Sequence, residues 1–401
     1  MGMTNDGGFI RVAVALRYGL MALATCAGLP IALAPQDAQA QDTIKIGVPA
    51  PLSGSYASGG ADIVDGGRLA VDQINAAGGE LGRKLELVPQ DDACNPDEAA
   101  KAASQLVAAG VVAVAGGYCS SAALPELRVL HDRHIPYVLG ASTSPQLTEH
   151  GWEDVFRTIG RADAQGGFVA HFMQDMLHAK RAAVIDDGST YSQGLAQSTI
   201  AALKQDGVEV VYDHAITPGQ ADYRDVIKAA ADSKADVLYF TGYYNDAAVL
   251  AKERRELTPA IKYFMGNGTA DPSLIEKGGR AVEGMIVTTS PLPQFFQQPR
   301  ARRFVKAYES AYQRAPGPYS VYEYDAIGVA AQAIKNAKST RPEDIAAALH
   351  ALTTYNGATG EIEFDQKGDR VNAPFMAVTV RNGKFVPYAS LDAKGRWVAA
   401  K

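Results

Sequence analysis

The sequence lacks the short motifs that mark most nucleotide-dependent and hydrolytic enzymes. It contains no G-x-x-x-x-G-K-[ST] phosphate loop, no G-x-S-x-G nucleophile elbow and no H-E-x-x-H zinc motif. Gly266-Asn267-Gly268 follows an apolar run as a dinucleotide fingerprint would, but Asp271 stands where the third glycine belongs. A catalytic triad assembled in space leaves no such motif, so a hydrolase stays open as an alternative. We expect neither an enzyme nor a cofactor site, because no residue pattern favours one.

Clustered positive charge is also missing, and so are long apolar runs after residue 40. The chain has 44 Asp and Glu against 38 Lys and Arg, and the basic residues form no run. Nucleic acid is therefore not an expected partner, since its recognition depends on clustered positive charge. A membrane-spanning helix needs about 20 apolar residues in succession, and no stretch after residue 40 reaches that length.

Residues 1–40 have the pattern of a secretory signal peptide. Arg11 and Arg17 precede an apolar segment, and Ala38-Gln39-Ala40 supplies an A-x-A cleavage site. Leu23-Ala24-Thr25-Cys26 is similar to a lipoprotein cleavage box, although the threonine before the cysteine fits poorly. We therefore expect a soluble exported protein rather than a lipid-anchored one.

Cysteine is scarce, with three in the chain, and cleavage after Ala40 removes Cys26. Cys94 and Cys119 remain in a protein bound for an oxidising compartment, so a disulfide is the default. Closing a loop of about 25 residues would stabilise the fold by roughly 3–4 kcal/mol in the chain-entropy model. The alternative, a reactive or metal-binding thiol, lacks a neighbouring base or ligand cluster in the sequence.

Short apolar runs alternate with helical patterns along most of the remaining chain. The first group of runs lies at 43–49, 84–89, 111–115 and 135–139, and the second at 181–186, 209–212, 237–240 and 262–265. This βαβα alternation predicts parallel, doubly wound sheets with right-handed crossovers. A length of 401 residues favours two domains. We therefore predict an α/β protein with two similar lobes.

The end of the chain has a different pattern. Asn382-Gly383 lies between the apolar runs 376–380 and 385–389, which is typical of a type I′ β-hairpin.

Small polar residues follow two neighbouring strands of the first predicted sheet. Cys119-Ser120-Ser121 lies between the run 111–115 and a helical spacing, so Ser120 or Ser121 is the expected N-cap. Ala141-Ser142-Thr143 follows the next strand. Open α/β sheets bind ligands at the carboxyl ends of their strands, and a helix N-terminus favours a carboxylate or phosphate. The alternative is that these residues only cap helices.

Tyrosines follow two strands of the second predicted lobe. Tyr191 comes shortly after the run 181–186, and Tyr243 and Tyr244 follow 237–240. A tyrosine there can cover a ligand with its ring and hydrogen-bond it through its hydroxyl. Packing between strand ends is the alternative.

Six short motifs now point to a known family. In chain order they are Pro51-Leu52-Ser53-Gly54, Asp91-Asp92-Ala93-Cys94, Cys119-Ser120-Ser121, Tyr191-Ser192-Gln193-Gly194, Thr241-Gly242-Tyr243 and Phe364-Asp365-Gln366-Lys367-Gly368-Asp369. Together they resemble the periplasmic leucine/isoleucine/valine-binding proteins of ABC importers, over essentially all of residues 43 to 390.

The resemblance implies the type I periplasmic binding protein fold, with two lobes joined by three hinge crossings. Lobe 1 would be 42–161 and 293–368, and lobe 2 would be 162–292 and 369–401. It also implies a periplasmic monomer that captures an amino acid and hands it to a membrane ABC permease. A sensory or amide-binding regulator of the same fold is the nearest alternative.

The resemblance assigns the expected site residues. The ligand carboxylate would be held by Ser120 and the turn Ala141-Ser142-Thr143, and Tyr191 and Tyr243 would contact the ligand from lobe 2. The Cys94–Cys119 pair also matches the family.

One position departs from the family pattern. Gly268 stands where aliphatic amino acid binders place the glutamate that meets the ligand ammonium. Asp271 could supply this charge, or an acid from another loop such as Glu323 or Asp325 could reach in. The third possibility is a ligand with a carboxylate and no amine, such as an aromatic or aliphatic acid. We favour Asp271, because a buried ammonium needs a partner.

Overall fold

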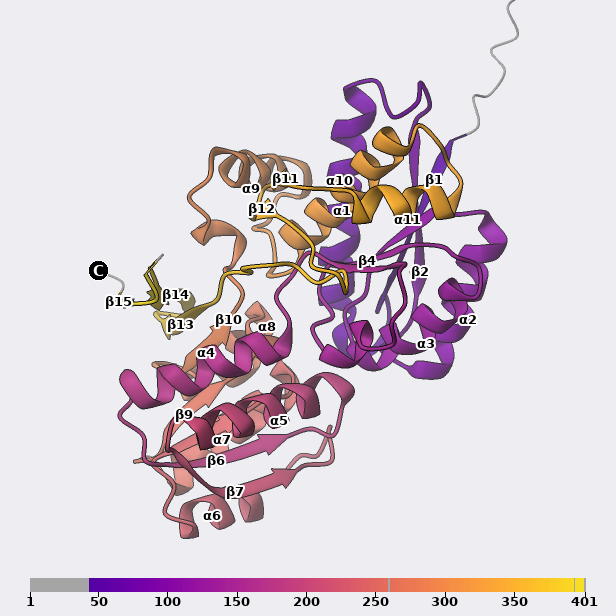
Figure 1. Cartoon of the computed structure of the whole chain (residues 1–401). Helices are drawn as coiled ribbons and strands as arrows, with labels where there is room; N and C mark the ends of the chain where they lie inside the picture. The colour runs from indigo at the N-terminus through magenta and orange to yellow at the C-terminus, as the bar shows by residue number, and fades with distance from the viewer. Residues whose placement is uncertain (1–42, 259, 393, 400–401) are drawn as a thin grey trace, which may run out of the picture. The chain divides into compact units, whose positions relative to one another are not determined.

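The computed structural model describes residues 43–258, 260–392 and 394–399. Its strands form two large sheets and one small antiparallel pair, and helices alternate with most of the strands (Figure 1). The predicted signal peptide, with Cys26 and the cleavage site, lies outside the described residues. Among the helices that are described, none is long and apolar enough to cross a bilayer.

The sheet of lobe 1 has five parallel strands in the order β2-β1-β3-β4-β5. These strands are β1 (Ile44–Ala50), β2 (Leu85–Asp91), β3 (Ala113–Gly116), β4 (Tyr137–Leu139) and β5 (Val155–Arg157). The helices between them are α1 (Ala57–Ala76), α2 (Pro96–Ala109) and α3 (Ser120–His131). Three later helices follow in the chain, α9 (Pro299–Tyr312), α10 (Ser320–Ala337) and α11 (Pro342–His350), and α10 packs on α1, β3 and β4.

The sheet of lobe 2 has eight strands in the order β15-β14-β13-β10-β9-β8-β6-β7. Its parallel part is β6 (Arg181–Asp186), β7 (Glu209–Ala215), β8 (Val237–Phe240), β9 (Lys262–Met265) and β10 (Ile286–Thr289). Its antiparallel part is β13 (Met376–Arg381), β14 (Lys384–Leu391) and β15 (Trp397–Ala399). The helices are α4 (Ala162–Asp175), α5 (Thr190–Gln205), α6 (Arg224–Asp232), α7 (Tyr244–Leu257) and α8 (Pro272–Gly278).

The order of the strands in each sheet indicates where a ligand would bind. In lobe 1 the order reverses between β1 and β3, and in lobe 2 it reverses between β6 and β8. At such a point neighbouring loops leave the sheet in opposite directions and open a crevice at the carboxyl ends of the strands. The Cys119-Ser120-Ser121 turn follows β3, and Tyr191 and Tyr243 follow β6 and β8. Each lobe therefore has part of its predicted residues at its own switch point, while Ala141-Ser142-Thr143 follows the adjacent β4 and Gly268 and Asp271 follow the adjacent β9.

The chain passes between the two sheets three times. It crosses after β5, returns after β10, and crosses again after the small pair β11 (Tyr355–Gly357) and β12 (Gly360–Ile362). The first and last crossings lie side by side, because Arg157 and Asp369 form an isolated parallel bridge.

Local sequence signals account for most element ends. The Asn95 side chain caps α2 by accepting from the N–H groups of Asp97 and Glu98, and Gly110 ends that helix with φ 75°. Asn382 and Gly383, with φ 51° and 69°, form the two-residue turn between β13 and β14. The predicted I′ hairpin is therefore confirmed.

Other elements lacked a sequence signal. The sequence predicted no strand at β5, β11 or β15 and no helix at α11, because each is short and three of the four lie at a sheet edge or in the small pair. Tyr191 was placed in a loop, but it is the second residue of α5, which begins at Thr190.

Candidate ligand-binding site

The serine turn links β3 to α3. Cys119 is the N-cap residue of α3, with φ −85° and ψ 122°, and Ser120 is already helical, so the predicted cap at Ser120 or Ser121 is wrong. The Ser120 Oγ instead accepts a hydrogen bond from the Ser144 N–H at 3.2 Å. This bond ties the turn to the following one. The first N–H groups of α3 have no partner within the helix, so they can bind an anion.

The predicted disulfide is present and holds the serine turn. Cys94 and Cys119 are bonded, with Cα atoms 5.4 Å apart. The Cys94 N–H also donates to Asp92 Oδ1 at 2.7 Å. The loop after β2 is therefore fastened to the start of α3.

The second turn, 141–144, carries buried hydroxyl groups without partners. Ser142 and Thr143 are buried, and neither side-chain oxygen has a hydrogen-bond partner among the described residues. The Thr143 carbonyl accepts from the Ala162 N–H at 2.9 Å, at the first crossing between the lobes. Buried polar groups usually have a partner, so these two hydroxyls and the equally unpartnered Ser144 Oγ make the turn a candidate for ligand binding.

Tyr191 holds a turn of lobe 2 in place. Its hydroxyl donates to Asn267 Oδ1 at 2.7 Å and accepts from the Gly268 N–H at 2.8 Å. Both bonds are local to lobe 2. The Tyr191 hydroxyl therefore positions the 267–268 turn, and its ring borders the site through contact with Tyr243, with centroids 5.1 Å apart.

Gly268 has no space for a side chain. A Cβ atom there would lie 2.8 Å from Tyr191 Cε1 and 2.9 Å from the Gly242 carbonyl oxygen. A glutamate at position 268 would therefore force Tyr191 and its hydrogen bonds to move. The Tyr191 ring therefore occupies the space that a side chain at position 268 would need.

Four tyrosines, which we call the tyrosine cluster, pack together from both lobes. Tyr118 stacks on Tyr243 with centroids 5.9 Å apart and meets Tyr319 edge-on at 5.3 Å, and Tyr56 lies 4.9 Å from Tyr243. The Tyr118 and Tyr243 hydroxyls are buried without partners. Burial raises the pKa of both hydroxyls well above the usual value, so both stay protonated.

The sequence prediction missed Tyr56, Tyr118 and Tyr319. A signal existed for the first two, since Tyr118 immediately precedes the serine turn and Tyr56 lies in the loop after β1. No local signal marks Tyr319, which precedes α10 and reaches the site only through the tertiary fold.

The three acidic candidates occupy different environments. Asp271 is 5% exposed, caps α8 by accepting from the Ser273 N–H at 2.8 Å, and interacts electrostatically with Tyr118 and Tyr319. Burial raises the pKa of Asp271 above its usual value. Of the three acids, Asp271 is the one that lies beside the tyrosine cluster.

The other two acids, Asp325 and Glu323, have their contacts within lobe 1. Asp325 accepts from the N–H groups of Ala358 and Thr359 at 2.7 and 2.8 Å, so it holds the loop between β11 and β12. Glu323 is fully buried next to Gly140, and neither of its oxygens has a partner among the described residues. Burial raises the pKa of Glu323 well above its usual value. The structure places neither acid beside the tyrosine cluster.

Hydrogen bonds join the two lobes around the tyrosine cluster. The Tyr244 hydroxyl donates to the Ser55 carbonyl at 2.9 Å, and the Tyr319 hydroxyl donates to the Asn267 carbonyl at 3.0 Å. A Cβ added to Gly194, near the start of α5, would lie 3.4 Å from Ser144 Oγ. Several contacts between the lobes therefore involve sequence neighbours of the predicted residues.

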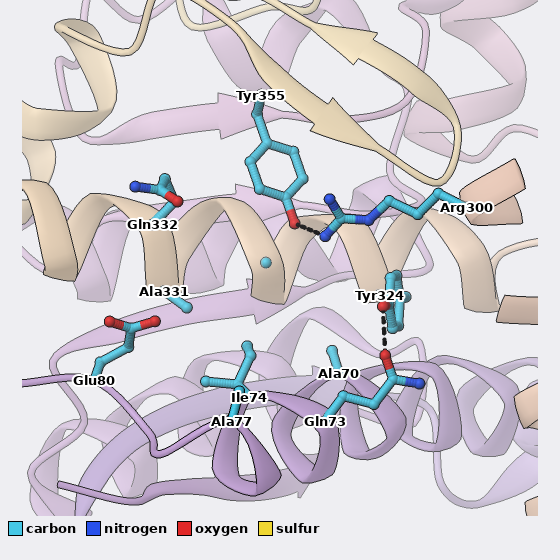
Figure 2. Close-up of a pocket in the computed structure, with 11 residues that line it drawn as sticks. Ala70, Gln73, Ile74, Ala77, Glu80, Arg300, Tyr324, Ala331, Gln332 and Tyr355 are labelled. Atoms are coloured by element: carbon cyan, nitrogen blue, oxygen red, sulfur yellow. Dashed lines mark hydrogen bonds between the residues drawn. The ribbon is translucent and has the colours of Figure 1, made fainter. Parts of the chain in front are cut away.

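A separate pocket of about 290 Å³ lies between α1 and α10 (Figure 2). Its hydroxyl groups have internal partners: Tyr324 donates to Gln73 at 2.7 Å, and Tyr355 accepts from Arg300 at 2.9 Å. None of the residues that line it belongs to the predicted site. This pocket is therefore separate from the predicted ligand-binding residues.

Hydroxyl groups, a helix N-terminus and tyrosine rings lie at the carboxyl ends of strands in two doubly wound lobes. Such a site can bind a small anionic or zwitterionic molecule between the lobes, and this defines the class of two-lobed α/β solute-binding proteins. The family model described as "Periplasmic binding protein" matches residues 43–384. The chain belongs to that family, and its relatives are solute-binding proteins rather than enzymes.

Individual relatives agree with this assignment. The chain is 31% identical over 337 residues to the leucine-, isoleucine-, valine-, threonine- and alanine-binding protein of Pseudomonas aeruginosa, covering 84% of this chain and 89% of that one. The leucine-binding protein from Thermotoga maritima superposes with a TM-score of 0.83 at 30% identity, over 88% and 99% of the chains. A solute-binding protein from R. palustris in complex with benzoate has the same fold, with a TM-score of 0.78, 21% identity and coverage of 90% and 98%.

Proposed function

We propose that this protein captures an amino acid, of branched-chain or a related type, between its two lobes in the periplasm and delivers it to a membrane ABC permease. Residues 1–40 would direct export and be removed, and the mature protein would act as a monomer. The resemblance to relatives named for binding leucine and related amino acids supports this ligand class.

One observation supports the proposal most directly: each lobe carries buried hydroxyl groups that have no hydrogen-bond partner among the described residues. Ser142, Thr143 and Tyr118 contribute them from lobe 1 and Tyr243 from lobe 2. An unsatisfied buried polar group costs about 1–3 kcal/mol, and a ligand that bonds to several of them removes that penalty. Because the groups lie on both lobes, such a ligand also favours the arrangement in which the lobes meet.

The carboxylate of the ligand belongs on lobe 1. There Ser120 opens α3, whose first N–H groups and positive dipole end favour an anion. Ala141, Ser142 and Thr143 form the neighbouring turn, which adds hydroxyl donors. Tyr243 covers the ligand from lobe 2, with Tyr191 behind it.

The ammonium of the ligand belongs near Asp271. One oxygen of this carboxylate caps α8, which leaves the other for the ligand. A cation beside Asp271 would offset the burial that raises its pKa. Gly268 is consistent with this assignment, because position 268 has no side chain and no charge of its own to offer the ammonium.

A carboxylic acid without an amine is the second candidate, since tyrosine rings and hydroxyls suit an aromatic acid. The deciding experiment is a thermal-shift panel that pairs each L-amino acid with its deaminated analogue, on wild type and on Asp271→Asn. We expect amino acids to stabilise the wild type more than their analogues, and Asp271→Asn to remove the difference. Equal or greater stabilisation by the deaminated acids would refute the amino-acid ligand.

A native mass spectrum of protein purified without denaturation provides an independent check, because a co-purified ligand reveals its mass. If amino acids stabilise the wild type more than their deaminated analogues do, and Asp271→Asn still binds them as tightly, then an acidic residue other than Asp271 pairs with the ligand ammonium.

A further inference from the structure

Arg157 lies directly behind the turn that is proposed to bind the carboxylate. It is the last residue of β5, and its side chain is fully buried. Its Nη1 donates to the carbonyl oxygens of Ser142 and Ser144, at 3.2 and 3.0 Å. Its Nη2 donates to Thr148 Oγ1 at 3.1 Å. One guanidinium therefore holds the 142–144 turn at two of its carbonyls.

The charge of Arg157 is balanced away from the turn. Its Nε lies 2.8 Å from Asp369 Oδ1, as a close ion pair without the alignment of a hydrogen bond. Asp369 also accepts from Arg161 at 2.7 Å and from Thr148 at 2.7 Å. Two cations share this buried carboxylate, and Arg161 also pairs with Asp163 at 2.8 Å and with Glu149 at 2.9 Å. The charge of Arg161 is therefore balanced by carboxylates other than Asp369. Only Arg157 of the two donates to the turn.

The peptide unit between Ser142 and Thr143 lies between the Arg157 guanidinium and the proposed position of the ligand carboxylate. In a planar trans peptide the C=O and N–H point in opposite directions. Because the Ser142 carbonyl points at Arg157, the Thr143 N–H points away from it. Among the residues that the structure describes, that N–H has no hydrogen-bond acceptor. A donor on the carbonyl side polarises the peptide and strengthens its N–H as a donor.

We propose that Arg157 is a positioning residue for carboxylate binding, which fixes the 142–144 turn and polarises the peptide between Ser142 and Thr143 so that its N–H favours an anionic ligand. The inference rests on the proposed function, since it assigns the carboxylate to the same turn. It adds a residue that does not itself touch the ligand and that no sequence motif marked.

The same residue connects the site to the last crossing between the lobes. The Arg157 N–H donates to the Gly368 carbonyl at 2.9 Å, and its side chain pairs with Asp369. The carboxylate turn and the crossing at 368–369 are therefore held by one residue. Binding at the turn is thereby mechanically coupled to a segment that joins the lobes.

The test compares an acid with its own primary amide in the full mature protein. The probe is the acid of the thermal-shift panel that binds wild type most tightly, for example L-leucine with L-leucinamide, titrated by calorimetry. Arg157→Met removes the charge at similar volume and should weaken the acid by about tenfold, because the turn loses both carbonyl bonds and the Thr143 N–H is no longer polarised. The amide should change by less than about threefold, because it carries no negative charge. Arg157→Lys should recover part of the loss.

Arg161→Gln is the matched control. Arg161 shares Asp369 with Arg157 and is also largely buried, but it makes no bond to the carbonyls of the turn. We expect its acid-to-amide ratio to stay at the wild-type value. A purely structural role of Arg157 predicts equal losses for acid and amide, and this result would overturn the proposal.

Asp369→Asn keeps the test decisive if Arg157→Met fails to fold. Removing the balancing anion leaves Arg157 more positive, so the acid-to-amide ratio should rise. A ratio that falls would contradict the charge argument. If no acid of the panel binds wild type, the proposed function fails as well. If wild type binds acids and Thr143→Ala weakens them while Arg157 variants do not, only this inference fails.

Discussion

The ring of Tyr118 stacks on the ring of Tyr243, with centroids 5.9 Å apart and planes 24° apart. Tyr118 follows β3 in the sheet of lobe 1, and Tyr243 follows β8 in the sheet of lobe 2. Both hydroxyls are buried without partners. The pair therefore joins the two lobes and at the same time lines the proposed site with polar groups.

Tyr118→Phe should separate these two roles. The ring contact remains, while an unsatisfied buried hydroxyl is lost, so the free energy of unfolding of the unliganded protein should rise by up to about 1 kcal/mol. Tyr319→Phe is the matched control, because its hydroxyl donates to Asn267 and its removal should destabilise. Urea unfolding of both variants measures the difference. Destabilisation by both would show that the Tyr118 hydroxyl has a partner.

Thr143→Ala should weaken ligand binding much more than it weakens the unliganded fold. Its buried hydroxyl has no partner among the described residues, so only the loss of the buried methyl group should lower stability, whereas a lost hydrogen bond to a charged group typically costs about 1.5–3 kcal/mol. The dissociation constant should rise by roughly 10- to 100-fold. Ser120→Ala should weaken binding too, and in addition lower stability, since Ser120 also accepts from Ser144.

Ser121→Ala is the control for that series, because Ser121 is the partly exposed neighbour on the same turn. Calorimetric titration should give it the wild-type affinity. Wild-type binding by both Thr143→Ala and Ser120→Ala would move the site elsewhere.

Gly268→Ala should destabilise the protein. The added methyl would lie 2.8 Å from Tyr191 Cε1, and overpacking of this kind typically costs about 1–3 kcal/mol. Gly167→Ala in α4 is the matched control, since a Cβ there meets nothing within 4 Å and alanine favours a helix. Thermal melts should move in opposite directions. Equal melting temperatures would mean that Tyr191 moves freely.

Glu323→Gln should change how stability depends on pH. Burial raises the folded-state pKa of Glu323, so the folded protein binds this proton more tightly than the unfolded chain does. The stabilisation that the protonated Glu323 contributes is therefore fully present below the pKa of Glu323 in the unfolded chain. It is lost as the pH rises toward the higher pKa of Glu323 in the folded protein. Glutamine cannot ionise, so the variant should gain stability over wild type as pH rises from the ordinary glutamate range. A constant difference between pH 4 and pH 8 would contradict the assignment.

The sequence by itself determined the alternation of strands and helices, the two turns of small polar residues and the disulfide. These features depend on local patterns, namely apolar period, capping residues and cysteine number, which act over a few residues. Gly268 and Asp271 were also identifiable in the sequence, and the helix that Asp271 caps begins at Pro272 as expected.

Only the tertiary structure decided which side chains meet. Tyr319 and Asn267 lie 52 positions apart and join through a single hydrogen bond, and Arg157 reaches Asp369 across the crossings. Such pairings depend on strand order and on how the lobes pack, and no period of the sequence encodes them. The structure also decided that the Tyr191 hydroxyl holds the Gly268 turn, because the space between two turns is fixed by the packing of both.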